Sequence, residues 1–321
     1  MKASRPSRSD TEAGRQLRGE GALLALVLLT SFAQPQAASS FQNKKTDDYT
    51  IRVKVEEVVL RATAQTSKGV LVSGLSKDNF QVYEDGALQQ IRHFSHEDIP
   101  VTVGLVVDNS GSMGPKRGPV IAAAMAFARS SNPQDEMFVV NFNEKVTFGL
   151  PVSKPFTDNV TELEAALFRT PATGETALYD AVAAALEHLQ SGNRDKKVLI
   201  VISDGGDNAS KHSLAQIRAM AAHSDAILYA IGIFDEEDVD RNPHVLKQLA
   251  KDTGGEAFLP ESLKDVPAIC EQIARDIRTQ YAIAYVPSNR KSDGIYRTIE
   301  VKAQASGYKH LIVRTRAGYS V

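Results

Sequence analysis

The first strongly patterned region of the chain, residues 49–97, alternates apolar and polar side chains. From Ile51 to Ala64 every second residue is apolar, with a change of phase at Glu56-Glu57, which predicts a long strand with a β-bulge. Asp85-Gly86 is a strong hairpin signal, and residues 88–94 supply the expected return strand. This region is therefore predicted to be entirely β.

The middle of the chain, residues 98–279, follows a different pattern, in which uninterrupted apolar runs alternate with segments of helical period. The apolar runs predict strands at 102–107, 136–142, 197–203, 226–233 and 256–259. The helical segments predict helices at 118–131, 158–168, 177–190, 213–223, 244–253 and 263–279. This order is typical of an α/β fold with a doubly wound, mainly parallel sheet.

The last region, residues 280–321, returns to the β pattern of the first. It predicts strands at 281–286, 296–303 and 311–315, with a turn at Asp293-Gly294. Because an isolated hairpin is marginally stable in water, each β region needs the other. We therefore expect one smaller, sandwich-like all-β domain built from both flanks, with the α/β domain inserted into it.

The N-terminus has the features of a secretory signal peptide at residues 1–33. Basic residues precede an apolar stretch from Gly21 to Ala33, which ends in the cleavage-like triplet Ser31-Phe32-Ala33. The stretch is too short for a membrane helix, so we expect no stable membrane insertion after cleavage and a secreted or periplasmic protein. An uncleaved anchor, a disordered cytoplasmic tail and cleavage near Ala38 or Ser39 are the alternatives. Residues 34–48 are polar and predict a flexible linker.

Charge and cysteine content exclude several classes of function. The formal net charge is −2, which does not favour a nucleic acid partner. Cys270 is the only cysteine, so the chain has no internal disulfide, thiolate zinc cluster or Cys-x-x-Cys pair. It lies on the apolar stripe of a predicted helix, where we expect it to pack in the core.

The apolar run at residues 103–107 ends in Asp108-x-Ser110-x-Ser112. A run without polar alternation is typical of a central parallel strand, and ligands gather at the carboxyl ends of such strands. One carboxylate and two hydroxyls are hard oxygen donors, which suit Mg²⁺ or Mn²⁺ ahead of Ca²⁺. The absence of soft ligands there disfavours zinc.

Two other segments bring oxygen donors to the same edge of the predicted sheet. A second buried run, residues 197–203, is followed by Asp204. Thr176 follows the loop 171–175 and opens the next predicted helix, so its hydroxyl is expected at a helix N-terminus.

These segments together resemble the von Willebrand factor A (VWA) domain with its metal ion-dependent adhesion site (MIDAS). That family carries Asp-x-Ser-x-Ser on a first loop, Thr on a second and Asp on a third. The resemblance covers about residues 98–279, and it implies the following metal ligands: Asp108, Ser110, Ser112, Thr176 and Asp204. The flanking segments 74–86 and 316–319 are similar to those of a bacterial secreted VWFA-related family.

Two positions depart from the family pattern. Glu175 stands where such proteins often have Gly, and Gly206 stands where an acidic residue is common. Neither position is an expected ligand, although Glu175 changes the local charge. A third feature, residues 235–240, carries five acids in six residues and is interpreted as a solvated acidic loop rather than as a second cation site.

The resemblance implies a secreted, cation-dependent protein-binding module for adhesion or interaction. Two carboxylates about neutralise a divalent ion and leave its remaining coordination positions to water. An acidic group of a protein partner replaces one of these water molecules. Two alternatives stay open: a metal-stabilised structural scaffold of an envelope assembly, and a metal-dependent hydrolase. We do not expect an enzyme, because the chain lacks Gly-x-Ser-x-Gly, His-Glu-x-x-His and Gly-x-x-x-x-Gly-Lys-Ser/Thr motifs.

Overall fold

The computed structural model describes residues 57–234, 241–291 and 294–320. The predicted signal peptide, the linker, the acidic loop 235–240 and Asp293 of the predicted turn lie outside the described residues. The described residues belong to one compact unit, which contains a three-layer α/β part and a pair of small antiparallel sheets.

The α/β part is built on a six-stranded sheet with the order β10-β9-β8-β5-β6-β7. Its strands are β5 (Val101–Asp108), β6 (Glu136–Phe142), β7 (Val146–Phe148), β8 (Lys196–Ser203), β9 (Ile227–Gly232) and β10 (Ala257–Phe258). All neighbours pair in parallel except β7, which lies antiparallel to β6 at one edge. The predicted doubly wound, mainly parallel sheet is confirmed.

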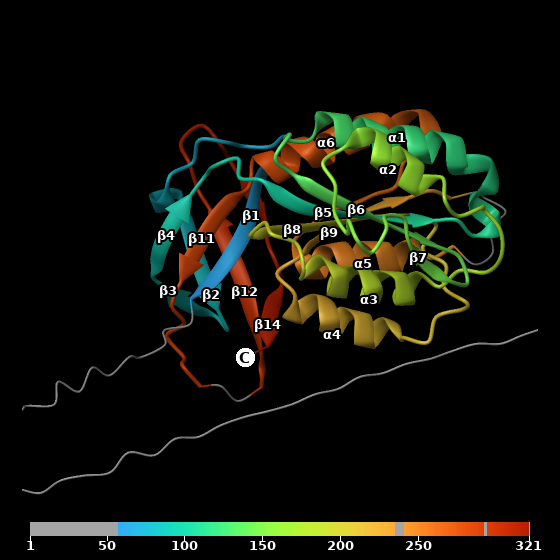
Figure 1. The fold of residues 1–321 in the computed structure, drawn as a ribbon. Helices are drawn as coiled ribbons and strands as arrows, with labels where there is room; N and C mark the ends of the chain where they lie inside the picture. Colours follow the sequence, from blue (N-terminus) through green and yellow to red (C-terminus); the bar gives the residue numbers. More distant parts are fainter. Residues whose placement is uncertain (1–56, 235–240, 292–293, 321) are drawn as a thin grey trace, which may run out of the picture. The chain divides into compact units, whose positions relative to one another are not determined.

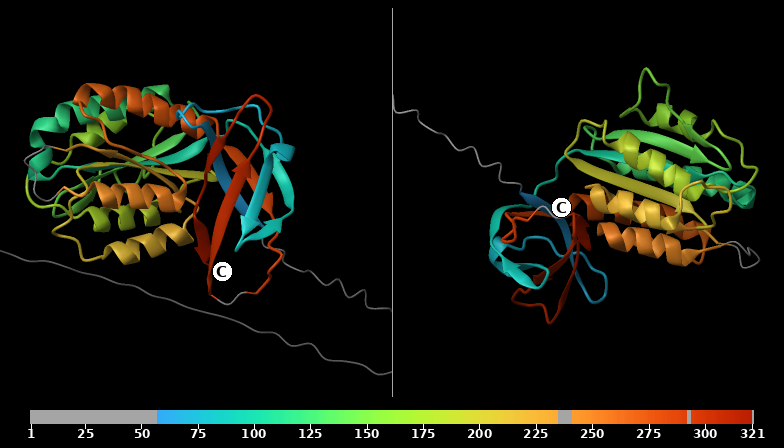
Figure 2. Two further views of the ribbon diagram at one scale, coloured as in Figure 1. Left: turned by 180° about the vertical axis from the view of Figure 1, so that it is seen from behind. Right: turned by 90° about the horizontal axis from the view of Figure 1, so that it is seen from below.

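Helices cover both faces of this sheet (Figure 1), and the view from behind in Figure 2 shows the same three layers. One face carries α1 (Arg117–Ser130), α2 (Val160–Leu167) and α6 (Val266–Arg278). The other carries α3 (Leu178–Leu189), α4 (Leu214–His223) and α5 (Pro243–Thr253). Cys270 lies buried on α6, as expected, and burial raises the pKa of its thiol to about 12.

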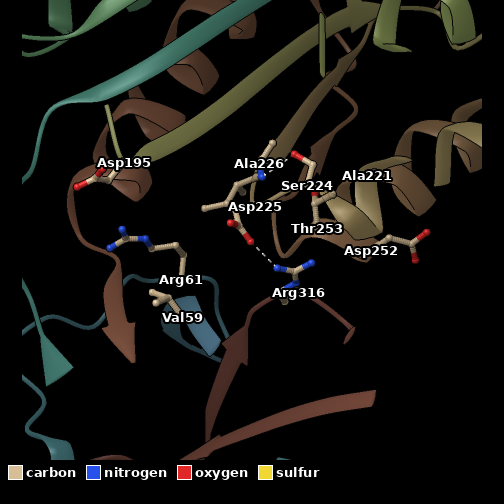
Figure 3. A pocket seen from close by; sticks show the side chains of 11 residues that line it. Val59, Arg61, Asp195, Ala221, Ser224, Asp225, Ala226, Asp252, Thr253 and Arg316 are labelled. Atoms are coloured by element: carbon tan, nitrogen blue, oxygen red, sulfur yellow. Dashed lines mark hydrogen bonds and ion pairs between the residues drawn. The ribbon is translucent and has the colours of Figure 1, made fainter. Parts of the chain in front are cut away.

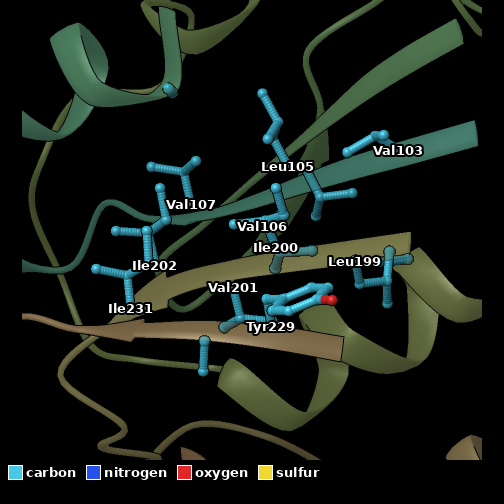
Figure 4. Close-up of a cluster of buried hydrophobic side chains, with 14 of the residues drawn as sticks. Val103, Leu105, Val106, Val107, Leu199, Ile200, Val201, Ile202, Tyr229 and Ile231 are labelled. Atoms are coloured by element: carbon cyan, nitrogen blue, oxygen red, sulfur yellow. The ribbon is translucent and has the colours of Figure 1, made fainter. Parts of the chain in front are cut away.

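The core lies where β5, β8 and β9 adjoin, and Figure 4 shows their aliphatic side chains standing above and below the sheet. Every residue of β5 is buried, which explains why its sequence has no polar alternation. Each fully buried Val, Leu or Ile side chain stabilises the fold by about 1.5–3 kcal/mol. The central strands are therefore a rigid platform for the loops that follow them.

The two β flanks combine into two four-stranded sheets, ordered β13-β1-β11-β4 and β14-β12-β2-β3. Their strands are β1 (Val58–Thr66), β2 (Phe80–Glu84), β3 (Ala87–Gln89), β4 (Ile91–Ser95), β11 (Tyr281–Tyr285), β12 (Tyr296–Ala303), β13 (Leu311–Arg314) and β14 (Gly318–Ser320). Each sheet takes strands from both ends of the chain, and a shared apolar cluster fills the space between them. The prediction that each flank completes the other is confirmed.

Some elements differ from the expectation. The hairpin at Asp85-Gly86 is present, with both residues at positive φ, but the predicted return strand 88–94 is not continuous. It divides into β3 and β4 because the chain leaves one sheet at Gln90 and joins the other at Ile91. The short edge strand β7 was not predicted, since its three residues are too few to establish a period. The predicted helix 263–279 begins with a 3-10 turn, Leu263–Asp265.

A buried polar joint connects the β sheets to the α/β part. Asp276 of α6 is 2% exposed and accepts hydrogen bonds from three side chains. Its carboxylate accepts from Thr63 Oγ1 of β1 at 2.7 Å, from Tyr229 OH of β9 at 3.0 Å and from Arg314 Nη2 of β13 at 2.5 Å. The Asp276 carboxylate therefore joins α6, strand β9 of the central sheet, and strands β1 and β13 of the sheet β13-β1-β11-β4.

Candidate metal centre

The strand order places a topological switch point between β5 and β8. From β5 the chain first winds outward through β6 and β7, and then returns to the other side of β5 as β8. Ligands of open α/β sheets bind in the crevice beyond the carboxyl ends of the strands at such a point. Asp108 is the last residue of β5, and Asp204 directly follows β8.

Four of the five predicted ligands are connected by hydrogen bonds at this edge. Ser110 Oγ lies 3.2 Å from Ser112 Oγ, and Ser112 Oγ donates to Asp204 Oδ2 at 2.7 Å. Asp108 Oδ1 accepts from the backbone N–H of Ser110 at 2.8 Å, and its Oδ2 accepts from Ser203 Oγ at 2.7 Å. Two carboxylates and two hydroxyls thus lie within a few ångströms of one another.

Thr176 reaches the same edge through the backbone of its loop. Gly111 N–H donates to the carbonyl of Gly174 at 3.0 Å, and Thr173 N–H donates to the carbonyl of Asn109 at 2.9 Å. These bonds align the second loop with the first. The expectation that Thr176 opens the helix was wrong, because α3 begins at Leu178 with Ala177 as its N-cap. Thr176 precedes the cap.

Burial and like charge favour a cation between the carboxylates. Asp108 and Asp204 are 2% and 3% exposed. Burial, followed by the charge of Asp204, raises the pKa of Asp108 to about 6, although hydrogen bonds from Ser110 and Ser203 lower it. A divalent ion between two buried carboxylates removes this repulsion.

The donor set fits a hard divalent ion. Carboxylate and hydroxyl oxygens suit Mg²⁺ or Mn²⁺, and the expected residues offer no thiolate or imidazole. Within the described ranges, no group of three or more His, Cys, Asp or Glu side chains is arranged to hold a metal. The site has only two carboxylates, so hydroxyls and water must complete the coordination of any ion bound there.

Sequence reasoning missed the residues that support the expected ligands. Ser203, the last residue of β8, donates to Asp108 and accepts from Gly205 N–H at 3.0 Å. Its position next to Asp204 at the end of a buried strand was a usable signal. Asn208 also lies here, but its partner is 32 positions away in the sequence, so no local pattern reveals its role. Glu175 is exposed, and Gly206 N–H donates to Asp204 Oδ1 at 3.0 Å.

A pocket of about 300 Å³ lies at the opposite, N-terminal edge of the sheet (Figure 3) and shares no residue with the expected site. Arg316 closes one side of it by donating to Asp225 Oδ1 at 2.8 Å. Arg61 extends into it from β1, and burial lowers the pKa of that guanidinium. The charged groups of this pocket therefore belong to the contact between the β sheets and the α/β part.

Comparison with known proteins supports the assignment of the central region. Residues 103–206, which include all five expected ligands, match the family model for the von Willebrand factor type A domain. The inter-alpha-trypsin inhibitor heavy chain H4 of Bos taurus is 25% identical over 207 residues, which are 60% of this chain. The matched region spans only 22% of that relative's length.

Two solved structures show the extent of structural likeness. A von Willebrand factor type A protein from Catenulispora acidiphila has a TM-score of 0.49 at 13% identity, covering 83% of this chain and 72% of that one. The vWF domain of the type V pili tip protein Mfa5 from Porphyromonas gingivalis has a TM-score of 0.47 at 14% identity, covering 56% and 95%. Residues 103–206 thus match the von Willebrand factor type A domain and lie within the doubly wound fold.

Proposed function

We propose that this chain is an exported protein-binding module that depends on a divalent cation. The ion, Mg²⁺ or Mn²⁺, is held by Asp108, Ser110, Ser112, Thr176 and Asp204. The observation that carries the proposal is the hydrogen-bonded chain from Ser110 through Ser112 to Asp204 at the switch point of the sheet. A serine hydroxyl that donates its proton to a carboxylate or to a neighbouring hydroxyl there is positioned to turn its lone pairs toward a cation.

The bound ion supplies a Lewis-acid position that an external carboxylate occupies. The two carboxylates of the site about neutralise a divalent ion, so an acidic side chain of a partner adds the next oxygen without excessive repulsion. The hydroxyls orient the ion and the buried strands keep the two carboxylates in place. Partner capture, rather than catalysis, is the role that this donor set supports.

Metal binding is tested by calorimetric titration of the metal-stripped protein with Mg²⁺ and Mn²⁺. We expect one site, lost in Asp204→Ala and in Asp108→Asn, which keeps the side-chain volume but removes the charge. Asp252→Ala is the control, because it deletes a carboxylate of the same domain that pairs with Arg218 at the surface. Wild-type protein that releases no binding heat contradicts the proposal, as does equal binding by Asp204→Ala.

Chelation separates recognition from a purely structural role of the ion. A ligand present at 100 times its Kd stabilises the native state by about 2.7 kcal/mol. Because this increment is present in either role, the two roles are compared in the metal-free state and by partner capture. If the ion serves recognition, partner capture is abolished by EDTA and by Thr176→Ala, while the metal-free variant keeps the thermal stability of the metal-free wild type. A scaffold role predicts no cation-dependent partner and a metal-free protein that loses its native fold.

Export is a separate part of the proposal and rests on residues 1–33. No helix among the described residues has the length and apolar character needed to span a bilayer. Intact mass measurement of the protein from its native host tests export. A mature chain that starts near residue 34 or 39 supports cleavage, and an intact N-terminus contradicts it.

A further inference from the structure

The peptide groups on either side of Thr176 are held by two neighbouring residues of the third loop, Asn208 and Ala209. Asn208 Oδ1 accepts a hydrogen bond from the backbone N–H of Thr176 at 2.8 Å. In return, the backbone N–H groups of Asn208 and Ala209 donate to the carbonyl of Thr176, both at 3.0 Å. Thr176 is buried, so these bonds form largely out of water. Its backbone position is therefore fixed from outside its own loop.

The same third loop also caps the helix that follows Thr176. The N-cap of α3 is Ala177, whose side chain offers no acceptor. Asp207 Oδ1 accepts from the backbone N–H of Tyr179 at 3.1 Å, and Ser210 Oγ accepts from that of Asp180 at 3.0 Å. Ser210 Oγ also donates to Asp207 at 2.5 Å. A loop far away in the sequence thus satisfies the free amides of the first turn of α3.

A carboxylate of α3 holds the far end of this loop. Asp180 Oδ1 accepts from the backbone N–H of His212 at 2.9 Å and lies 2.7 Å from His212 Nδ1. The Asp180 carboxylate also accepts from Lys211 N–H at 3.1 Å. The segment 207–212 therefore lies along the start of α3 and is fixed to it at both ends.

The third loop begins at the expected ligand Asp204, so it connects this ligand to Thr176 through the hydrogen bonds of Asn208. Only Gly205, Gly206 and Asp207 separate Asp204 from Asn208. Gly205 has a φ of +78°, and a Cβ there would lie 2.4 Å from the carbonyl oxygen of Asn242. The path from Asp204 to Asn208 is therefore short and sterically confined.

We infer that Asn208 is a positioning residue that sets where Thr176 stands relative to Asp204, so that the second and third loops act as one unit. The inference rests on the proposed metal site. It adds a residue outside the matched range 103–206 and outside the expected ligand set. Residues that orient metal ligands typically change metal affinity by 10- to 100-fold when they are replaced.

Calorimetric titration of the metal-stripped, full-length protein with Mn²⁺ tests the inference. We expect Asn208→Ala to weaken Mn²⁺ binding about 10-fold, within the range for groups that orient ligands. Asn208→Asp keeps an oxygen acceptor for the Thr176 N–H and should restore the affinity. The matched control is Asn159→Ala, because Asn159 Oδ1 also accepts a backbone N–H at 2.8 Å, at the N-cap of α2. The control should lose stability and keep wild-type affinity.

A double-mutant cycle distinguishes positioning from a general loss of stability. If Asn208 acts through Thr176, Asn208→Ala adds little to the defect of Thr176→Ala, because the ligand it positions is already absent. Its effect should remain almost complete in a Ser112→Ala background. Full additivity with Thr176→Ala overturns the inference, as does wild-type affinity of folded Asn208→Ala.

Amide hydrogen exchange provides a readout that needs no metal. In the metal-free protein, Asn208→Ala should lower the protection of the Thr176 amide at least 10-fold, whereas Asn159→Ala should leave it unchanged. If wild-type protein binds no Mn²⁺, the proposed function fails while this exchange measurement still decides the positioning role. Unchanged protection of the Thr176 amide in Asn208→Ala overturns the inference.

Discussion

The glycine at position 104 shows how closely the central sheet is packed. Gly104 lies in the middle of β5, where a Cβ would stand 2.4 Å from Cζ of Phe138 and 2.5 Å from Cδ2 of Leu199. Real Cβ atoms do not approach so closely, so both neighbours must move to admit a methyl group. The Phe138 ring also contacts Phe156 and His188, which limits that movement.

Replacing Gly104 by alanine should therefore destabilise the protein by about 1–3 kcal/mol, the usual cost of overpacking a core. The matched control is Gly118→Ala in α1, where a Cβ would meet no atom within 4 Å. That change should stabilise the protein by about 0.4–1 kcal/mol, because alanine loses less backbone entropy in a helix. Urea denaturation of the two variants checks the sign of each change in stability. Equal midpoints for the two variants contradict the packing argument.

Among the secondary-structure elements, those that bury a periodic apolar pattern were predictable, and those fixed by distant partners were not. The strands at 136–142 and 296–303 were predicted with the bounds that the structure shows. By contrast, the first amides of α3 bond to Asp207 and Ser210 of another loop, which the sequence of the helix itself does not reveal. The division of the strand 88–94 depends on which sheet each half joins, which its own sequence does not encode.

The residues of the candidate site likewise include some that were predictable from the sequence and some that were not. The oxygen-bearing residues at the ends of β5 and β8 could be read from the sequence, because apolar runs locate the sheet edge and the family resemblance supplied their order. The position of Ser203 beside Asp204 was also a usable signal, but Asn208 could not be assigned, since its role consists of hydrogen bonds to a residue 32 positions away. Contacts of that range leave no local pattern.

A buried lysine links β8 to the end of α6. Lys196 is 4% exposed, and its Nζ donates to the carbonyl of Ile277. Burial lowers the pKa of this ammonium from its ordinary value of 10.5 to about 7. The nearby cations Arg61 and Arg278 lower it as well, whereas Asp276 and Asp98 oppose the shift. The folded protein therefore disfavours the charged form of this side chain.

This shift predicts a pH-dependent difference between the wild type and Lys196→Met. Between about pH 7 and 10.5 the unfolded chain binds more protons at this position, so wild-type stability rises with pH across that window. Below pH 7 the full cost of burying the charge is present, and Lys196→Met should be relatively most stable there. The difference should shrink by up to about 1.4 kcal/mol per pH unit within the window.

Denaturation of both proteins between pH 6 and 10 measures this difference. Lys247→Met, the same replacement on the exposed face of α5, provides the control for the chemical change itself. A stability difference for Lys196→Met that stays constant from pH 6 to 10 rules out a strongly shifted lysine.

For the molecule as a whole, stability depends on the joint between the β sheets and the α/β part. Apolar clusters fill each part separately, so the contact between them rests largely on polar groups. Asp276 is the centre of that contact, and Arg314 from the last part of the chain pairs with both Asp276 and Glu256. Arg316 adds a second connection through Asp225 and the carbonyl of Ala222.

Removing the central carboxylate should affect the whole molecule. Asp276→Ala leaves the Arg314 guanidinium and the hydroxyls of Thr63 and Tyr229 without their shared acceptor. Breaking a buried ion pair in this way costs about 3–5 kcal/mol. By comparison, Asp252→Ala removes a partly exposed ion pair with Arg218 and should cost no more than about 1 kcal/mol.

Because Asp276 bonds to both the β sheets and the α/β part, we expect a single unfolding transition that shifts for both parts together. Thermal unfolding followed by circular dichroism tests this, and an Asp276→Ala midpoint equal to that of Asp252→Ala would mean that the two parts are stabilised independently of the joint.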